Sequence, residues 1–205
     1  MPVRKTDRPP SRPTATPRGR PRSLVSEQAI LNATLRILST EGYAALTLDR
    51  VAAEARASKA TIYRRWKTKE HLVLAVFSQL PPVVPEEGRN LEEELLLLFS
   101  QSARFMQDSP LKSVLPSLAA ECVRNPALSS ALILVNEQRR APPRLVLQRA
   151  IRRGELPADT DIELAIDVIQ GAVAIRLYFL LDTLSETWIR RLVRLVIAGL
   201  RAQKS

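Results

Sequence analysis

The segment SKATIYRRWKTKEHL, residues 58–72, concentrates side chains that could bind an anion. Ser58 and Thr68 are typical helix N-caps, and each is followed at once by a lysine, Lys59 or Lys69. A helix N-terminus already carries about half a positive charge, so a cation there costs roughly 0.3–1 kcal/mol. Two lysines placed against two helix dipoles therefore predict an anion that both helix ends face.

These basic side chains belong to a wider charge asymmetry along the chain. Between Arg56 and Lys69 there are six lysines and arginines and no carboxylate. Residues 1–22 carry a net charge of +6 and residues 23–72 one of +3, whereas residues 73–205 carry only +1 of the total +10. Excess positive charge confined to the first third predicts a nucleic-acid partner for that third. The anion is therefore expected to be the phosphate of double-stranded DNA.

Composition argues against several other classes of protein. One cysteine, Cys122, and one histidine, His71, provide neither an intramolecular disulfide nor a zinc site. The most apolar run, residues 162–182, contains Glu163 and Arg176, so we expect it to be buried in protein and not in a membrane. No nucleophile–base pair or glycine-rich phosphate loop is found, so we expect no catalytic residue, metal or cofactor. A cytoplasmic protein that is not an enzyme is the expectation.

Hydrophobic spacing predicts an all-α fold with about nine helices. Thr47, Ser58 and Thr68 are expected N-caps, and Asn90 with Glu93 has the pattern of a capping box. Gly42 and Gly154 are placed to end helices with a left-handed residue. The expected helices span residues 26–41, 48–55, 59–66, 69–80, 90–107, 111–122, 126–153, 161–182 and 185–201.

Changes in composition divide the chain into three parts. Residues 1–22 hold six of the fifteen prolines and almost no large apolar side chains, which predicts a disordered basic arm. Residues 23–80 contain the short helices around the basic segment. The proline-rich stretch PPVVPEEG, residues 81–88, marks the start of a larger helical domain, residues 81–205.

The segment TLDRVAAEARASKATIYRRWKTKEHL (47–72), preceded by ILNATLRILSTEGYAAL (30–46), resembles the DNA-binding domain of TetR-type transcriptional regulators. The match includes the tight EARAS connection of a helix-turn-helix. A weaker resemblance covers RAIRRGELPADTDIELAIDVIQGAVAIRLYFLL (149–181), which is similar to the dimer-forming part of such regulators. The resemblance implies a helix-turn-helix DNA-binding domain followed by a larger ligand-binding and dimerisation domain.

The resemblance also assigns roles to individual residues of the helix-turn-helix. It assigns phosphate contacts to Thr47, Ser58, Tyr63 and Lys69, and contacts to base edges or the groove to Lys59, Thr61 and Arg64. Arg65 is left open between a base and a phosphate contact. Ile62 and Trp66 lie four residues apart and are expected to face the core.

One position departs from the family pattern. Arg56 stands where such regulators usually have glycine, in a turn that commonly needs a left-handed backbone. A side chain there costs about 1 kcal/mol, so either the turn differs or strain is tolerated. Arg56 is a further candidate phosphate contact, with its placement left open.

The N-terminal arm provides a second candidate contact with DNA. The sequence Arg18-Gly19-Arg20-Pro21 resembles the core of an AT-hook, and Arg22 follows directly. An extended basic segment can enter a narrow A·T minor groove, where the negative potential attracts arginine. The alternative is a flexible tail that only adds solubility.

The larger domain carries two further predictions. Aromatic and sulfur-containing side chains could line a ligand cavity between helices: Phe77, Phe99, Phe105, Met106, Tyr178 and Phe179. The last two helices are expected to pair with their symmetry mates in a four-helix dimer interface. The expected interface residues are Ile166, Ile169, Gly171, Val173, Trp188, Leu192, Leu195 and Val196.

These features predict a homodimeric, sequence-specific transcriptional regulator that binds a (pseudo)palindromic DNA operator. In regulators of this kind, an unknown small-molecule effector most often releases a repressor from its operator. The alternative is an architectural or constitutive dimeric DNA-binding protein without an effector. A cavity of several hundred cubic ångströms would favour the effector.

Overall fold

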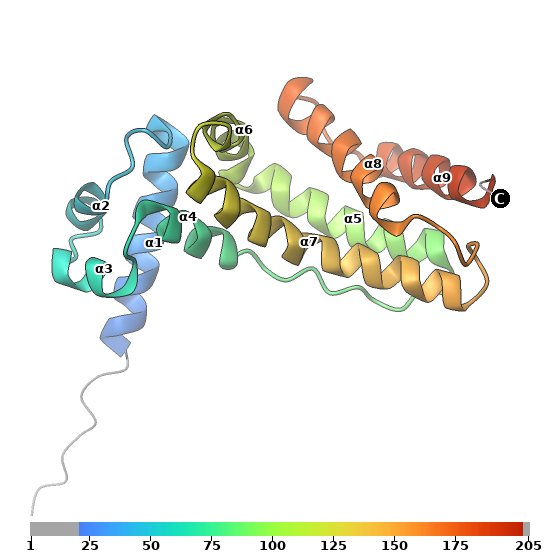
Figure 1. Ribbon diagram of the computed structural model, residues 1–205, viewed down its shortest axis with the longest axis horizontal. Coiled ribbons are helices and arrows are strands. Elements are labelled where there is room, and N and C mark those ends of the chain that lie inside the picture. Colours follow the sequence, from blue (N-terminus) through green and yellow to red (C-terminus); the bar gives the residue numbers. More distant parts are fainter. Residues whose placement is uncertain (1–20, 203–205) are drawn as a thin grey trace, which may run out of the picture.

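The computed structural model describes residues 21–202, apart from the side chains of residues 21–26 and Asp108. Within that range the fold is all-α, as predicted, with nine α-helices, one π-helical turn and no strand. Figure 1 shows an elongated molecule with α2 and α3 at one end and α9 at the other. The helices are α1 (Pro21–Glu41), α2 (Leu48–Glu54), α3 (Lys59–Arg65), α4 (Lys69–Ser78), α5 (Leu91–Asp108), α6 (Leu111–Cys122), α7 (Pro126–Arg152), α8 (Ile162–Ala174) and α9 (Glu186–Ala202), with the π-helical turn η1 at Ile175–Phe179.

Side-chain caps set the starts of the short helices. Thr47, Ser58 and Thr68 each accept a hydrogen bond from the backbone N–H three residues later, at 3.1, 3.2 and 3.4 Å. Asn90 caps α5 and Asn125 caps α7 in the same way, at 3.0 and 3.1 Å. The three predicted N-caps of the first third are therefore confirmed, as is that of α5.

Glycines end two helices as predicted. Gly42 follows α1 with a φ of +80°, and Gly154 follows α7 with a φ of +74°. At the end of α7, Gly154 N donates to Ile151 O at 3.0 Å and Glu155 N to Ala150 O at 2.9 Å. This pair of bonds is the Schellman motif, which satisfies carbonyls that the helix would otherwise leave open.

Two predicted boundaries are wrong. The first helix begins at Pro21 instead of Ser26, because proline is tolerated in a first helical turn, where no N–H is needed. The helix expected over residues 161–182 is α-helical only to Ala174, continues as the π-helical turn η1 to Phe179, and stops before Leu181, which has a φ of +52°. The chain folds back there because Arg176 forms an ion pair with Asp182 and donates to the Thr183 carbonyl at 2.8 Å.

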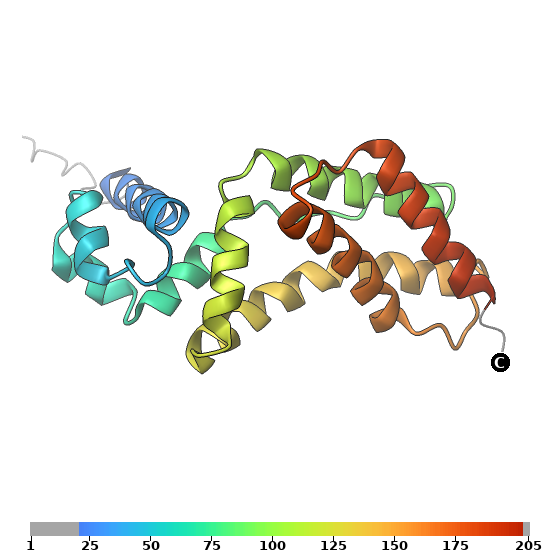
Figure 2. The same ribbon diagram turned by 90° about the horizontal axis from the view of Figure 1, so that it is seen from above.

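Two apolar clusters hold the fold together. The first is formed by α1–α4 and extends into α6 and the start of α7 through residues such as Leu118, Leu128 and Val135. The second joins α5, α8, α9 and the later part of α7, including Val146 and Leu147. Figure 2 shows α6 and α7 reaching from the large helical body to the small helices. The small helices are thus packed onto the body by a shared core.

Helix α7 connects these two clusters through 27 residues and contains Pro142 and Pro143 between them. Proline has no N–H, so the carbonyls of Gln138 and Arg139 lack the donors that would lie four residues later.

No helix within residues 21–202 has both the length and the apolar character needed to span a bilayer.

Candidate nucleic-acid interface and cavity

One face of α3 packs against the core, and the opposite face is exposed. Ile62 is fully buried and Trp66 is 7% exposed, as predicted from their spacing. Tyr63 is 44% exposed, and Arg64 and Lys59 are also exposed. The residues predicted to contact DNA on α3 therefore lie on an outward surface at one end of the molecule (Figure 1).

The turn before α3 keeps a left-handed backbone although it carries an arginine. Arg56 has a φ of +50°. Its N–H donates to Ala53 O at 3.2 Å, and Ala57 N donates to Ala52 O at 2.9 Å, which makes the turn another Schellman motif. The usual geometry is thus retained at a conformational cost, and the exposed side chain of Arg56 lies between α2 and α3.

The lysines at the two helix starts have partners within the chain. Lys59 Nζ lies 2.6 Å from Asp49 Oδ2, and Tyr63 donates from its hydroxyl to Asp49 Oδ1 at 3.3 Å. The hydrogen bond from Lys59 lowers the pKa of the Asp49 carboxyl. Lys69 Nζ lies 3.9 Å from the centre of the Tyr43 ring. The exposed Lys59–Asp49 pair contributes little to stability, so a DNA phosphate could replace Asp49 as the partner of Lys59.

The two adjacent arginines of α3 differ in what they contact. Arg65 Nη1 lies 2.5 Å from Glu27 Oε2 on α1, and its guanidinium is 6.0 Å from the Trp66 ring centre. The side chain of Arg64 forms no hydrogen bond or ion pair with any described residue. The Arg64 side chain is therefore not engaged by the described part of the chain, whereas Arg65 connects α3 to α1 through Glu27.

The predicted contacts of the arm are only partly covered by the structure. Arg18 and Arg20 lie outside the described residues, and Arg22 lies in the first turn of α1.

The predicted phosphate contacts Thr47 and Ser58 cap α2 and α3, and Ser58 Oγ is also 2.8 Å from Thr61 Oγ1.

A polar cluster joins the small helices to the large domain. Tyr43 donates from its hydroxyl to Glu70 Oε1, and Asn125 Nδ2 donates to Tyr43 Oη at 3.0 Å and to Glu70 Oε1 at 3.1 Å. Burial raises the pKa of Tyr43, and the bond to Glu70 raises it further. Burial also raises the pKa of Glu70, but the hydrogen bonds it accepts outweigh burial and lower that pKa to about 2. Asn125 lies at the start of α7 and Tyr43 lies between α1 and α2, so this cluster links the α1–α2 connection and α4 to α7.

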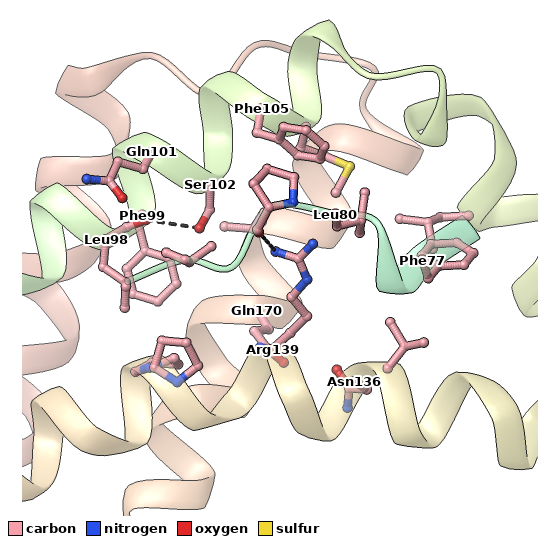
Figure 3. Close-up of a pocket in the computed structure, with 18 of the residues that line it drawn as sticks. Phe77, Leu80, Leu98, Phe99, Gln101, Ser102, Phe105, Asn136, Arg139 and Gln170 are labelled. Atoms are coloured by element: carbon pink, nitrogen blue, oxygen red, sulfur yellow. Dashed lines mark hydrogen bonds between the residues drawn. The ribbon is translucent and has the colours of Figure 1, made fainter. Parts of the chain in front are cut away.

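A cavity of about 510 Å³ lies between α4, α5, α7 and α8. Figure 3 shows its residues pointing inward from α5 above and α7 below. Five of the six predicted ligand residues line it: Phe77, Phe99, Phe105, Met106 and Tyr178. Phe179 does not, because it is 75% exposed in η1. Burial raises the pKa of Tyr178 to about 12, so its hydroxyl stays protonated and can donate.

Sequence reasoning missed the polar residues of the cavity. Ser102, Asn136, Arg139 and Gln170 all line it. Arg139 stands in the segment EQRRAPP, where one arginine faces the cavity and the next, Arg140, faces α8. No local sequence signal distinguishes the two, because the packing of α8 on α7 decides which side is enclosed.

The exposed apolar face of α8 differs from the one predicted. Ile166 and Ile169 are fully buried within one chain and Val196 is 7% exposed, so these three residues are not available to a partner. Val173 also lines the cavity. Trp188 and Leu192 are partly buried, whereas Gly171 is exposed and Leu195 is 71% exposed. The outward stripe consists of Leu164, Val168, Gly171, Ile175 and Phe179 along α8 and η1, with Leu195 on α9.

Three features now stand together: a basic helix-turn-helix, a cavity in a helical domain, and an unpaired apolar helix face. They define a regulator that recognises DNA at one end and carries a separate domain at the other. The chain matches the bacterial regulatory proteins of the tetR family over residues 30–76, and the tetracyclin repressor-like C-terminal domain over residues 84–196.

Known proteins resemble the chain over most of its length. The transcriptional regulator YdeS of Bacillus subtilis, itself uncharacterised, is 30% identical over 190 residues, covering 90% of this chain and 94% of its own. The DNA-binding transcriptional repressor TetR of Mycobacteroides abscessus is 33% identical over 173 residues, covering 80% and 88%. The crystal structure of the TetR family regulator SCO0332 aligns with a TM-score of 0.68 at 26% identity, covering 85% and 97%. The chain belongs to the TetR family of DNA-binding transcriptional regulators, which bind operators as dimers.

Proposed function

We propose that this regulator is a cytoplasmic repressor that a small-molecule effector releases from a (pseudo)palindromic operator. Residues 23–80 bind the DNA, and residues 81–205 bind the effector and form the dimer. The observation that supports this mechanism is the position of the cavity. Phe77, in the last turn of α4, and Leu80, two residues after its end, line it, and the same helix starts with the proposed phosphate contact Lys69.

The route from cavity to DNA runs through α4. An effector that pushes on Phe77 moves α4, which is packed in the same core as α1 and α3. The polar cluster of Tyr43, Glu70 and Asn125 fixes the other end of α4 to α7. An architectural protein without an effector would have no need of a cavity of this size at this junction.

Competition without a shared site is the test of this mechanism. Operator DNA must weaken effector binding by the same factor by which the effector weakens DNA binding. We would select operator sequences from a random DNA pool, find an effector by metabolite screening, and measure its affinity with and without saturating operator. Equal affinities would contradict the allosteric mechanism while leaving the DNA-binding assignment intact.

The dimer is proposed to form through the outward stripe of α8, η1 and α9. Two copies must place their α3 helices in successive major grooves, roughly 34–36 Å apart or a multiple of it. Val168→Glu places a charge in the middle of this stripe, where Val168 is 48% exposed in the single chain. Sedimentation should show monomers with an intact helical spectrum. Ile133→Glu, at another exposed apolar position (59%), is the control that should remain dimeric.

A further inference from the structure

One cationic side chain faces the cavity. Arg139 is the only charged residue among the described residues that line it. It projects from α7 toward the connection between α4 and α5, where its Nη1 donates to the Pro81 carbonyl at 3.4 Å (Figure 3). Its Nη2 is buried and has no hydrogen-bond partner. A guanidinium has five N–H donors, so most of the hydrogen-bonding capacity of Arg139 is unused.

The neighbouring arginine shows how this fold normally satisfies a buried guanidinium. Arg140 donates to Glu163 Oε2 at 2.7 and 3.1 Å, and it also forms an ion pair with Asp167. Arg139 forms no ion pair with any described carboxylate. The two residues lie on one helix one position apart, and only the one facing the cavity lacks an anion.

Arg139 does not escape the cost of an unpaired charge by losing its proton. Arg139 is partly buried, and this burial lowers the pKa of its guanidinium. Arginine nevertheless keeps its charge in proteins. A buried charge without a counterion is costly, so an anion entering this cavity gains what Arg139 lacks.

The rest of the cavity restricts what that anion can be. Its other lining residues are apolar or neutral, including Phe99, Phe105 and Leu98 on α5. A single arginine balances a single negative charge, so a multiply charged phosphate would be left partly uncompensated among apolar walls. A carboxylate also matches the planar fork of a guanidinium with two parallel hydrogen bonds.

We propose that the cavity binds an apolar organic monocarboxylate whose carboxylate pairs with Arg139. The inference rests on the proposed function, because it names the class of effector for the same cavity. The neutral donors of Tyr178 and Gln170 line the same space and can hold the second face of the carboxylate.

The same contact links the ligand to DNA binding. The Pro81 carbonyl is the only described acceptor of Arg139, and Pro81 lies three residues after the end of α4. A carboxylate is a stronger acceptor than a carbonyl at 3.4 Å, so the ligand draws Arg139 away from Pro81. The connection that follows α4 is then loosened at Pro81, while Arg149 of α7 still donates to the Pro85 carbonyl at 3.2 Å.

The test uses three probes of equal length: decanoate, 1-decanol and decylamine. Calorimetry on the DNA-free full chain measures the affinity for each probe, in the wild type and in Arg139→Met. We expect the wild type to bind decanoate at least about tenfold more tightly than decanol, and to reject decylamine. In Arg139→Met the preference for decanoate over decanol should disappear. Arg152→Met, the same change at an exposed site of α7, should keep it.

Each other outcome is informative. Equal or tighter binding of decanol by the wild type, an unchanged preference in Arg139→Met, or no binding of any probe would overturn the carboxylate inference. Melting temperatures of both variants show whether a loss reflects unfolding, and Arg139→Lys, which keeps the charge, should retain part of the preference. Release of pool-selected DNA by decanol would overturn the inference but keep the proposed function. Decanoate binding that depends on Arg139 but does not release DNA would keep the carboxylate inference and contradict the proposed function.

Discussion

The outward surface of α3 and the cavity both present cations, but in opposite settings. On the surface, Lys59 is exposed and forms an exposed ion pair with Asp49. In the cavity, Arg139 is alone, with a buried nitrogen that has no partner. Many screened charges give affinity that depends on salt and little on sequence, whereas one desolvated charge gives selectivity. Under the two proposals, these regions recognise anions by different physics.

Salt should separate the two regions most strongly. If the dimer contacts six to ten phosphates, affinity for DNA should fall by about 10³–10⁵ between 50 and 200 mM salt. Ligand affinity in the cavity should change far less over the same range, because buried interactions are screened less. Fluorescence anisotropy with labelled DNA and calorimetry with ligand measure the two slopes. A flat DNA slope would contradict the whole interface.

Arg64→Ala should change which bases are preferred. We expect a loss of about 1–3 kcal/mol at one base position, because Arg64 is free to reach a base edge. Arg65→Ala is the comparison: it removes the contact with Glu27 and should weaken all sequences alike. Selection from a random DNA pool with each variant measures the preference. An unchanged preference in Arg64→Ala would make Arg64 a phosphate contact.

Arg56→Gly should stabilise the chain while weakening DNA binding. Glycine adopts a φ of +50° without the cost of a Cβ, so the free energy of unfolding should rise by about 1 kcal/mol. Arg56→Ala removes the same side chain but keeps the strained backbone, so it should show no such gain. Urea denaturation of the three proteins measures this difference. Equal stability of the glycine and alanine variants would mean that the turn is not strained.

The smallest expected effect is that of Glu70→Gln on how the free energy of unfolding changes at acid pH. The pKa of Glu70 lies near 2 in the folded chain, below its ordinary 4.5. Its stabilising contribution is therefore present above about pH 4.5 and is lost as the pH falls toward 2. The wild type should lose stability over that window more steeply than Glu70→Gln. Glu186→Gln, an exposed carboxylate on α9, is the control, and equal slopes for all three proteins would reject the cluster as the cause.

Sequence patterns predicted the two regions unequally. Caps such as Ser58 and Thr68, and the burial of Ile62 and Trp66, follow from spacing within a few residues, and the structure confirms them. Which side of α7 or α8 faces outward depends on packing between distant helices. That is why two of the four α8 residues expected at the interface, Ile166 and Ile169, are buried in the core of a single chain, and why Arg139 could not be recognised as a cavity residue.

The paired prolines of α7 have a mechanical consequence. They remove two successive backbone bonds between the part of α7 that packs with the small helices and the part that packs with α5, α8 and α9. A helix bends most readily at such a point. Asn125 lies 14 residues before Arg139, or roughly 21 Å along the axis, so a swing of about 10° would displace that tip by about 4 Å. In a dimer joined through α8 and α9, bending of α7 at the prolines would therefore move the two α3 helices apart while the dimer interface stays closed.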